Sequence, residues 1–165
     1  SNIPSMAFSS TPVIPKSVKY AGFLSFSGED VRSNFIDHLY HALKHKSIYP
    51  YKDTERIKKG KNITDALNGS IEDSKFYIIV FSMNYASSSW CLDELVKIME
   101  CHKTKEHTAF PVFYDVEPRE VRKQKGKVKK AFASLKKEKA AGKWREAMKE
   151  AANEAGWELK NTVDG

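Results

Sequence analysis

The run Phe76–Phe81 places six apolar residues in succession, without the polar alternation of a strand that has one face in water. A strand of this kind is buried on both faces, so helices must cover each side of its sheet. Ala109–Tyr114 repeats the pattern, and segments with helical periodicity lie before and after both runs. This alternation predicts an α/β fold, a doubly wound, flavodoxin-like parallel sheet of about five strands flanked by helices.

The remaining elements follow from apolar periodicity and from turn residues. Helices are expected over Asp30–Lys46, Asn62–Asp73, Trp90–Lys103, 127–141 and 143–155. Two further strands are expected over Tyr20–Phe26 and Ile48–Tyr51, and Pro50 favours an edge position for the second. Trp157–Leu159 is too short to be assigned as a fifth strand. Polar loops are expected over 53–61 and 117–126.

The 165 residues suffice for one domain with its own core. Residues 1–18 are expected to form a flexible leader, residues 19–157 the domain, and residues 158–165 a C-terminal tail. No apolar run approaches the length of a membrane span, and no secretory signal layout stands at the start. Cys91 and Cys101 lie ten apart on one expected helix, too far apart to bond, which favours a reducing compartment. We expect the cytoplasm, with the nucleus as an alternative.

The net charge of +7 is concentrated in one segment. Residues 119–149 hold 13 lysines and arginines against three acids, a net charge of +10, so the rest of the chain is at −3. Such a basic segment could attract nucleic acid, an anionic membrane surface or an acidic partner. The alternative is a solvated helical face, which is favoured because lysine is a usual surface residue.

The segment 87–95 reads Ser-Ser-Ser-Trp-Cys-Leu-Asp-Glu-Leu, in which hydroxyl residues end a loop and a helix begins. Trp90 and Glu94 are four apart and share one helical face. A core stripe on another face is formed by Leu92, Leu95, Val96 and Met99. An aromatic plate and a carboxylate off the core stripe suit a ligand with a flat ring and a developing positive charge. The spacing alone favours a Trp packed at the core edge beside a solvated Glu.

The same segment resembles the signature of TIR domains, the Toll/interleukin-1 receptor class, from plant immune receptors. Four other segments agree in order and spacing. They are Phe-Leu-Ser-Phe-Ser-Gly-Glu-Asp-Val-Arg at 23–32, Lys-Lys-Gly-Lys-Asn-Ile at 58–63, Pro-Val-Phe-Tyr-Asp-Val-Glu-Pro at 111–118, and Trp-Arg-Glu-Ala at 144–147 with Ala-Ala-Asn-Glu-Ala-Gly-Trp at 151–157. The match runs from Lys19 to Trp157, and five segments in register argue against coincidence.

The resemblance implies an NAD⁺ nucleosidase that acts in immune and cell-death signalling. Glu94 stands at the family's catalytic position. The implied substrate-binding residues are Trp90, Ser89, Phe26, Ser27 and Gly28. NAD⁺, or NADP⁺, is then the substrate, and no cofactor is implied. The five histidines show no metal-like clustering with acids or cysteines, so no metal site is expected.

Cleavage of the bond between nicotinamide and ribose requires few catalytic groups. Nicotinamide is cationic in NAD⁺ and departs as a neutral molecule, so its departure requires no general acid. Positive charge grows on the ribose in an oxocarbenium-like transition state, which one well-placed carboxylate can stabilise. The carboxyl ends of the strands are where such a sheet binds ligands, and the resemblance implies a site at the same edge.

Self-association is the second property that the resemblance implies. The first helix, with Asp37 and His38, matches a contact position of the family, although His38 also suits an ordinary exposed helical histidine. The implied loop and assembly residues of the charged segment after the second strand are Asp53, Lys59, Gly60 and Ile63. Activity per molecule is therefore expected to rise with protein concentration.

Three departures from the family pattern leave other functions open. Ser27 replaces an Arg suited to the pyrophosphate, Ala21-Gly22 replaces Asp-Val, and Ser47 stands where Gly is usual. The loss of that cation favours a non-catalytic module that only contacts other TIR domains. The basic segment 119–149 favours, weakly, a nucleic-acid-dependent cyclic nucleotide synthetase.

Overall fold

A computed structural model describes residues 22–33, 35–47, 50–52 and 65–159. Its centre is a five-stranded parallel sheet in the order β2-β1-β3-β4-β5. The strands are β1 (Gly22–Ser25), β2 (Pro50–Lys52), β3 (Phe76–Phe81), β4 (Thr108–Tyr114) and β5 (Trp157–Leu159). The predicted fold class is confirmed, β2 lies at the edge as Pro50 indicated, and the short segment 157–159 does form the fifth strand.

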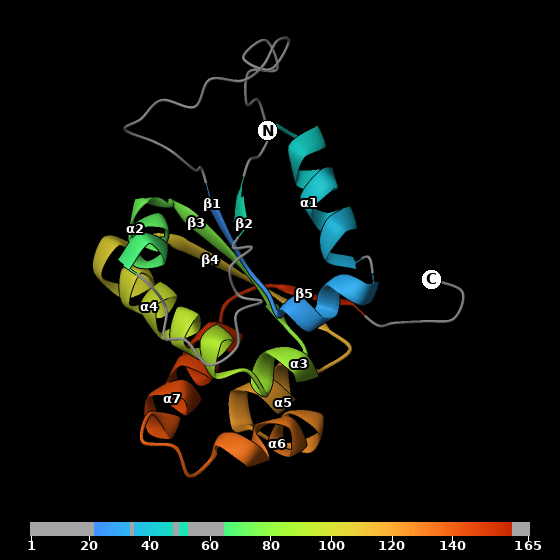
Figure 1. Cartoon of the computed structure of the whole chain (residues 1–165), viewed down its shortest axis with the longest axis vertical. Helices are drawn as coiled ribbons and strands as arrows, with labels where there is room; N and C mark the ends of the chain where they lie inside the picture. Colours follow the sequence, from blue (N-terminus) through green and yellow to red (C-terminus); the bar gives the residue numbers. More distant parts are fainter. Residues whose placement is uncertain (1–21, 34, 48–49, 53–64, 160–165) are drawn as a thin grey trace.

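Helices cover both faces of this sheet, and a further group lies beyond its carboxyl edge (Figure 1). The helical elements are η2 (Gly28–Ser33), α1 (Phe35–His45), α2 (Asp65–Asp73), α3 (Met83–Ala86), α4 (Ser89–Lys105), α5 (Pro118–Lys123), α6 (Gly126–Phe132), η4 (Ala133–Leu135) and α7 (Ala141–Ala152). The face with α2, α4 and α7 is opposite the face with α1. None of the helices in the described ranges is long and apolar enough to cross a membrane.

Strand geometry divides the core into two clusters, because neighbouring residues of a strand point to opposite faces. Phe23 and Ile79 belong to the larger cluster, together with residues of α2, α4 and α7. Leu24 and Val80 belong to the smaller cluster, into which α1 inserts Ile36. Every residue of β1 and all but the first of β3 are buried, as expected for strands covered on both sides.

Two of the departures from the family pattern have local structural correlates. Gly22 pairs with Phe76 across β1 and β3, and a Cβ atom at Gly22 would overlap the Phe76 ring. The absence of a side chain at this position therefore lets the ring lie over β1. Ser47, which follows α1, has φ 63°, a left-handed conformation that favours glycine.

Three predicted segments were wrong in extent or type. The helix expected over Asp30–Lys46 is divided into η2 and α1, and the one expected over 127–141 ends at Leu135 with η4. The next residues, Lys-Lys-Glu-Lys at 136–139, are all exposed and offer no apolar side chain to the core. The polar loop expected over 117–126 contains helix α5.

Glu120 explains why a helix forms in this polar segment. Its carboxylate accepts from the Glu117 N–H at 2.9 Å and from the Lys127 N–H at 2.7 Å, so it caps the starts of both α5 and α6. Pro118 occupies the first turn of α5, where its missing N–H costs no helical bond. Gly126 has φ 52°, and a Cβ atom there would collide with the Glu120 carboxylate. The signal was present as Glu-Pro-Arg-Glu at 117–120.

Candidate active site

The candidate site lies at the carboxyl edge of the two central strands. β1 ends at Ser25, which pairs with Ile79 of β3, so the segments that follow the two strands begin beside each other. The chain after β1 enters η2 and the chain after β3 enters α3. Two residues separate helix α4 from α3, and the second of them, Ser88, caps α4 with its hydroxyl, which accepts from the Cys91 N–H at 3.2 Å.

Glu94 is the centre of this site. Its Oε1 accepts from the Ser25 hydroxyl at 2.8 Å, and its Oε2 accepts from the indole Nε1 of Trp90 at 3.0 Å. The Glu94 side chain has 0% exposure and Trp90 has 8%. The expectation that both lie off the core stripe was therefore wrong, and so was the alternative of a solvated Glu94.

Paired hydrogen bonds explain how a carboxylate is tolerated at this depth. An unpaired buried carboxylate is strongly disfavoured, whereas each charge-assisted bond offsets part of the lost hydration. Trp90 packs in the larger core cluster and directs its N–H at Glu94. Asp93, the next acid along the helix, accepts instead from Trp144 Nε1 of α7 at 2.9 Å. The two neighbouring acids of α4 therefore face different sides of the helix, as successive helical positions do.

A second buried carboxylate lies at the same edge. Asp30 of η2 accepts from the Ser82 hydroxyl at 2.6 Å and from the Asn84 amide at 2.9 Å. Burial raises the pKa of Asp30, and the hydrogen bonds from Ser82 and Asn84 oppose that shift. Ser82 also caps α3, since its oxygen accepts from the Tyr85 N–H at 3.1 Å.

Sequence reasoning missed four polar residues of this edge, which are Ser25, Asp30, Ser82 and Tyr85. Ser25 and Ser82 stand directly at the carboxyl ends of apolar strands, where a parallel sheet places its ligands. That position was the available signal. Tyr85 carried none, because a Tyr four residues beyond a strand is an ordinary core residue.

The other residues expected to bind substrate have distinct places. Ser27 is 3% exposed, and its hydroxyl accepts from the Glu29 N–H at 3.3 Å, just after Gly28 opens η2. Phe26 is buried in the cluster under α1, but its carbonyl accepts from the Cys91 thiol at 3.5 Å and so joins β1 to α4. Ser89 is the exposed first residue of α4. Cys91 is a free, buried cysteine, as is Cys101.

The residues expected to mediate assembly are only partly described. On α1, Asp37 is half-buried and His38 is exposed. Asp53, Lys59, Gly60 and Ile63 lie outside the described residues. In the part of the chain that the structure describes, no group of three His, Cys, Asp or Glu residues could hold a metal ion.

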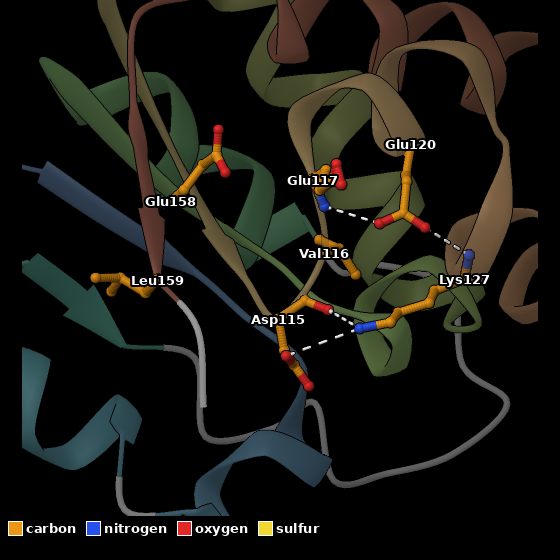
Figure 2. A pocket seen from close by; sticks show the side chains of 7 residues that line it. All are labelled: Asp115, Val116, Glu117, Glu120, Lys127, Glu158 and Leu159. Carbon is orange, nitrogen blue, oxygen red and sulfur yellow. Dashed lines mark hydrogen bonds and ion pairs between the residues drawn. The ribbon is translucent and has the colours of Figure 1, made fainter. Parts of the chain in front are cut away.

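An acidic pocket of 340 Å³ lies apart from Glu94 (Figure 2). It opens between the end of β4, the α5–α6 junction and β5 and is lined by Asp115, Val116, Glu117, Glu120, Lys127, Glu158 and Leu159. Lys127 Nζ donates to the Asp115 carbonyl at 3.0 Å and lies 3.8 Å from its carboxylate. Burial alone would raise the pKa of Glu120, but the hydrogen bonds from the backbone N–H groups of Glu117 and Lys127 outweigh it and lower this pKa. These bonds assign Glu120 a structural role at the starts of α5 and α6, and they hold Lys127 against Asp115.

Six lysines form a basic surface on α6, α7 and the turns between them. They are Lys129, Lys130, Lys136, Lys137, Lys139 and Lys143, and all are exposed. None of the six makes an ion pair with a described residue, and Glu138 is the one acid among them. Phe132 and Trp144 of the same segment are buried against each other.

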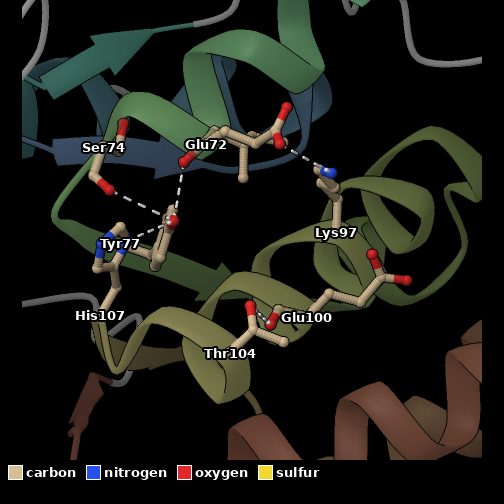
Figure 3. A network of polar contacts seen from close by, with 8 residues as sticks. Glu72, Ser74, Tyr77, Lys97, Glu100, Thr104 and His107 are labelled. Atoms are coloured by element: carbon tan, nitrogen blue, oxygen red, sulfur yellow. Dashed lines mark hydrogen bonds and ion pairs between the residues drawn. The ribbon is translucent and has the colours of Figure 1, made fainter.

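A polar network holds the amino edge of the sheet (Figure 3). The Tyr77 hydroxyl of β3 donates to the Ile71 carbonyl of α2 at 2.8 Å and lies 3.1 Å from Nδ1 of His107. Burial, with the charges of Lys105 and Lys75, lowers the pKa of His107. Lys97 of α4 lies 3.7 Å from Glu72 of α2. This network fastens α2 to β3 and α4, at the end of the sheet opposite the Glu94 site.

Comparison with known proteins assigns the family. The family model described as TIR domain matches residues 19–164. The chain is 52% identical over 154 residues to the disease resistance protein RPV1 of Vitis rotundifolia, with 92% of this chain and 11% of that protein covered. It is 48% identical over 150 residues to the TMV resistance protein N of Nicotiana glutinosa, with 88% and 13% covered. The chain thus spans about a tenth of the length of the curated relatives it matches.

A solved structure agrees with these relatives. The TIR domains of the activated Roq1 resistosome, which directly recognises the pathogen effector XopQ, match with a TM-score of 0.77 and 45% sequence identity. The match covers 88% of this chain and 91% of that one. The residue pattern, the parallel sheet and both kinds of comparison agree: the chain belongs to the TIR domain family.

Proposed function

We propose that this TIR domain hydrolyses the nicotinamide–ribose bond of NAD⁺ or NADP⁺, and that the reaction serves immune signalling in a plant resistance protein. The observation that carries the proposal is the Glu94 carboxylate, each of whose oxygens accepts a hydrogen bond at the carboxyl edge of the sheet. Such a carboxylate stabilises the positive charge that grows on the ribose as nicotinamide departs. The likeness to plant disease resistance proteins supports the setting.

The burial of Glu94 adds a step to this proposal. A side chain with 0% exposure cannot contact a dinucleotide until the surrounding edge opens. We propose that self-association drives the opening, which fits the likeness to TIR domains of a resistosome. The proposed contacts are Asp37 and His38 on α1, with Asp53, Lys59, Gly60 and Ile63 outside the described residues. The proposed location is the cytoplasm, or the nucleus.

Nicotinamide release tests the function. Concentrated protein is incubated with NAD⁺ or with NADP⁺, and free nicotinamide is measured over a wide dilution series. We expect release by the parent, activity per molecule that rises with concentration, and loss of release in Glu94→Gln, which removes the charge but keeps an oxygen acceptor. Asp93→Asn is the matched control because Asp93 faces Trp144 and should keep full activity.

Two outcomes would overturn the proposal: no nicotinamide at any concentration, or a Glu94→Gln variant as fast as the parent. The first outcome would favour the non-catalytic module that only contacts other TIR domains. A specific observation favours a second activity, the nucleic-acid-dependent cyclic nucleotide synthetase. The six exposed lysines of residues 129–143 lack ion-pair partners among the described residues, and such lysines attract polyanions.

Ser27 tests substrate binding separately. We propose that Ser27→Arg, which restores the family's usual cation, lowers the Michaelis constant for NAD⁺ through a contact with the pyrophosphate. A charge-assisted hydrogen bond of this kind contributes about 1.5–3 kcal/mol. Because Ser27 is 3% exposed, the Arg must extend from the edge to avoid burial. An unchanged Michaelis constant would show that residue 27 does not face the ligand.

A further inference from the structure

A line of buried hydroxyl groups leads to Oε1 of Glu94, whereas Trp90 bonds Oε2. The Tyr85 hydroxyl lies 2.8 Å from the Ser25 hydroxyl, and the Ser25 hydroxyl lies 2.8 Å from Glu94 Oε1. All three side chains have 0% exposure. They come from three elements, α3, β1 and α4, and Ser25 and Glu94 are 69 residues apart in the chain.

Proton counting gives this line a direction. A serine hydroxyl carries a single hydrogen, and an ionised carboxylate can only accept. Ser25 therefore donates its hydrogen to Glu94, and its oxygen accepts the hydrogen of Tyr85. The order is Tyr85 to Ser25 to Glu94, in which each bond polarises the next.

Both hydroxyl groups of the line are held by rigid parts of the fold. Ser25 is the last residue of β1 and pairs with β3. The Tyr85 backbone N–H donates to Ser82 at 3.1 Å, and its ring packs edge-on against Phe81 at 5.3 Å between centroids. Side chains fixed in this way hold a catalytic group more accurately than loop residues do.

We propose that Tyr85 and Ser25 are positioning residues for the Glu94 reaction: Tyr85 orients the Ser25 hydroxyl, and Ser25 holds Glu94 Oε1 in its reactive orientation. The inference rests on the proposed function and adds two residues that neither touch nor bind the dinucleotide. Loss of either hydroxyl should slow the chemical step and leave substrate binding unchanged, because the effect reaches the substrate only through Glu94.

The first experiment compares two buried tyrosines that lie at opposite edges of the sheet. Tyr85→Phe and Tyr77→Phe each remove one hydroxyl from a fully buried ring, but Tyr77 bonds to Ile71 at the opposite edge of the sheet. We expect Tyr85→Phe to lower kcat for nicotinamide release about fivefold with KM unchanged, since the bond it removes joins two neutral hydroxyl groups. Tyr77→Phe should lose comparable thermal stability and keep kcat.

The pH profile gives a readout that a merely structural role would not move. A carboxylate that loses donors is easier to protonate, so the acid-side fall in rate should move to higher pH in Tyr85→Phe and not in Tyr77→Phe. The other buried or half-buried acids described at this site, Asp30 of η2 and Asp93 of α4, are present in every variant. Equal effects of the two tyrosine variants on kcat, or no effect of either, would overturn the proposal.

A double-mutant cycle tests the order of the line. If Tyr85 acts through Ser25, then Tyr85→Phe should lower kcat in the parent but have no further effect in a Ser25→Ala background. If the losses in kcat from the two changes multiply, the two residues act independently, and the proposal that Tyr85 acts through Ser25 is rejected. Ser25→Ala removes a single oxygen and adds no volume, so it serves also if Tyr85→Phe folds poorly.

Failure of the proposed function can be told apart from failure of this inference. If the parent releases no nicotinamide, the carboxyl carbon of Glu94 is followed by NMR in protein with ¹³C-labelled glutamate and assigned with Glu94→Gln. If Tyr85 acts on Glu94 through Ser25, the pH midpoint of this signal rises in Tyr85→Phe and stays at the parent value in Tyr77→Phe. A midpoint that is the same in all three proteins would reject the inference whatever the activity.

Discussion

The Ser82 hydroxyl donates to the Asp30 carboxylate at 2.6 Å, although the two residues lie 52 positions apart in the chain. The bond joins the segment that follows β1 to the segment that follows β3. Asn84 adds a second bond to the same carboxylate at 2.9 Å. Asp30 thus fixes η2 against the start of α3, the helix that carries Tyr85, and burial raises its pKa above 3.8.

The raised pKa of Asp30 predicts a pH-dependent stability difference. A carboxyl group with a raised folded-state pKa stabilises the fold most when protonated, below about pH 3.8, and loses that contribution as pH rises through the folded-state pKa. Asn has no such titration. Asp30→Asn should therefore gain stability relative to the parent as the pH rises above about 3.8, measured by urea unfolding at a series of pH values. If the stability of Asp30→Asn relative to the parent falls with rising pH, the raised pKa of Asp30 is contradicted.

Burial of Glu94 predicts that its removal costs stability as well as activity. Glu94→Ala would leave the Ser25 hydroxyl and the Trp90 N–H without their acceptor in the core. Each unsatisfied buried group costs about 1–3 kcal/mol, so the free energy of unfolding should fall by at least this amount. Glu94→Gln, which keeps an acceptor, should lose less. Equal stability of the parent and Glu94→Ala would restore the sequence-based expectation of an exposed residue.

Gly126 and Gly142 differ in whether the fold can accommodate a larger residue at that position. At Gly126 a Cβ atom would collide with the Glu120 carboxylate and φ is 52°, whereas at Gly142 of α7 a Cβ atom would meet nothing within 4 Å. Gly126→Ala should lower the free energy of unfolding by about 1 kcal/mol or more, through backbone strain and a weakened cap. Gly142→Ala should raise it by about 0.5–1 kcal/mol through helix propensity. Thermal or urea unfolding of both variants measures the contrast.

The basic surface predicts salt-dependent binding of nucleic acid. Lys136→Glu with Lys137→Glu should weaken binding to duplex RNA or DNA and reduce the slope of log K against log salt, measured by fluorescence anisotropy. Lys44→Glu with Lys46→Glu is the matched control, because these exposed lysines at the end of α1 give the same change in net charge elsewhere. Equal losses in the two double variants would leave only an effect of overall charge.

The predictable part of the fold is the part encoded locally. The apolar run Phe76–Phe81 contains its own evidence for a doubly covered strand, and the predicted bounds match β3. Helix α5 was missed because apolar periodicity is absent from a six-residue helix whose start depends on Glu120. The Glu-Pro-Arg-Glu spacing at 117–120 held that information, but in the form of a cap.

The burial of Glu94 could not be predicted because its cause is not local. A carboxylate in a helix normally faces water, and one of the donors that make the interior tolerable, the Ser25 hydroxyl, lies 69 residues earlier. The Trp90–Glu94 spacing correctly placed the two side chains together, but it held no information about the Ser25 hydroxyl. Of the residues that complete the site, Ser25 carried only the signal of its place at the end of an apolar strand, and Tyr85 becomes recognisable only when β1 and α3 are in position.

Helix α4 contains two native reporters of local opening, Cys91 at 1% exposure and Cys101 at 3%. Cys91 is bonded to the Phe26 carbonyl near the Glu94 edge, whereas Cys101 lies ten residues later, toward the end of the helix that meets Tyr77. A thiol reagent reaches each only when its own surroundings unfold transiently, so the two alkylation rates measure the opening free energies at the two ends. Opening of the Glu94 edge can therefore be compared with opening of the far end of α4 in the protein without any substitution.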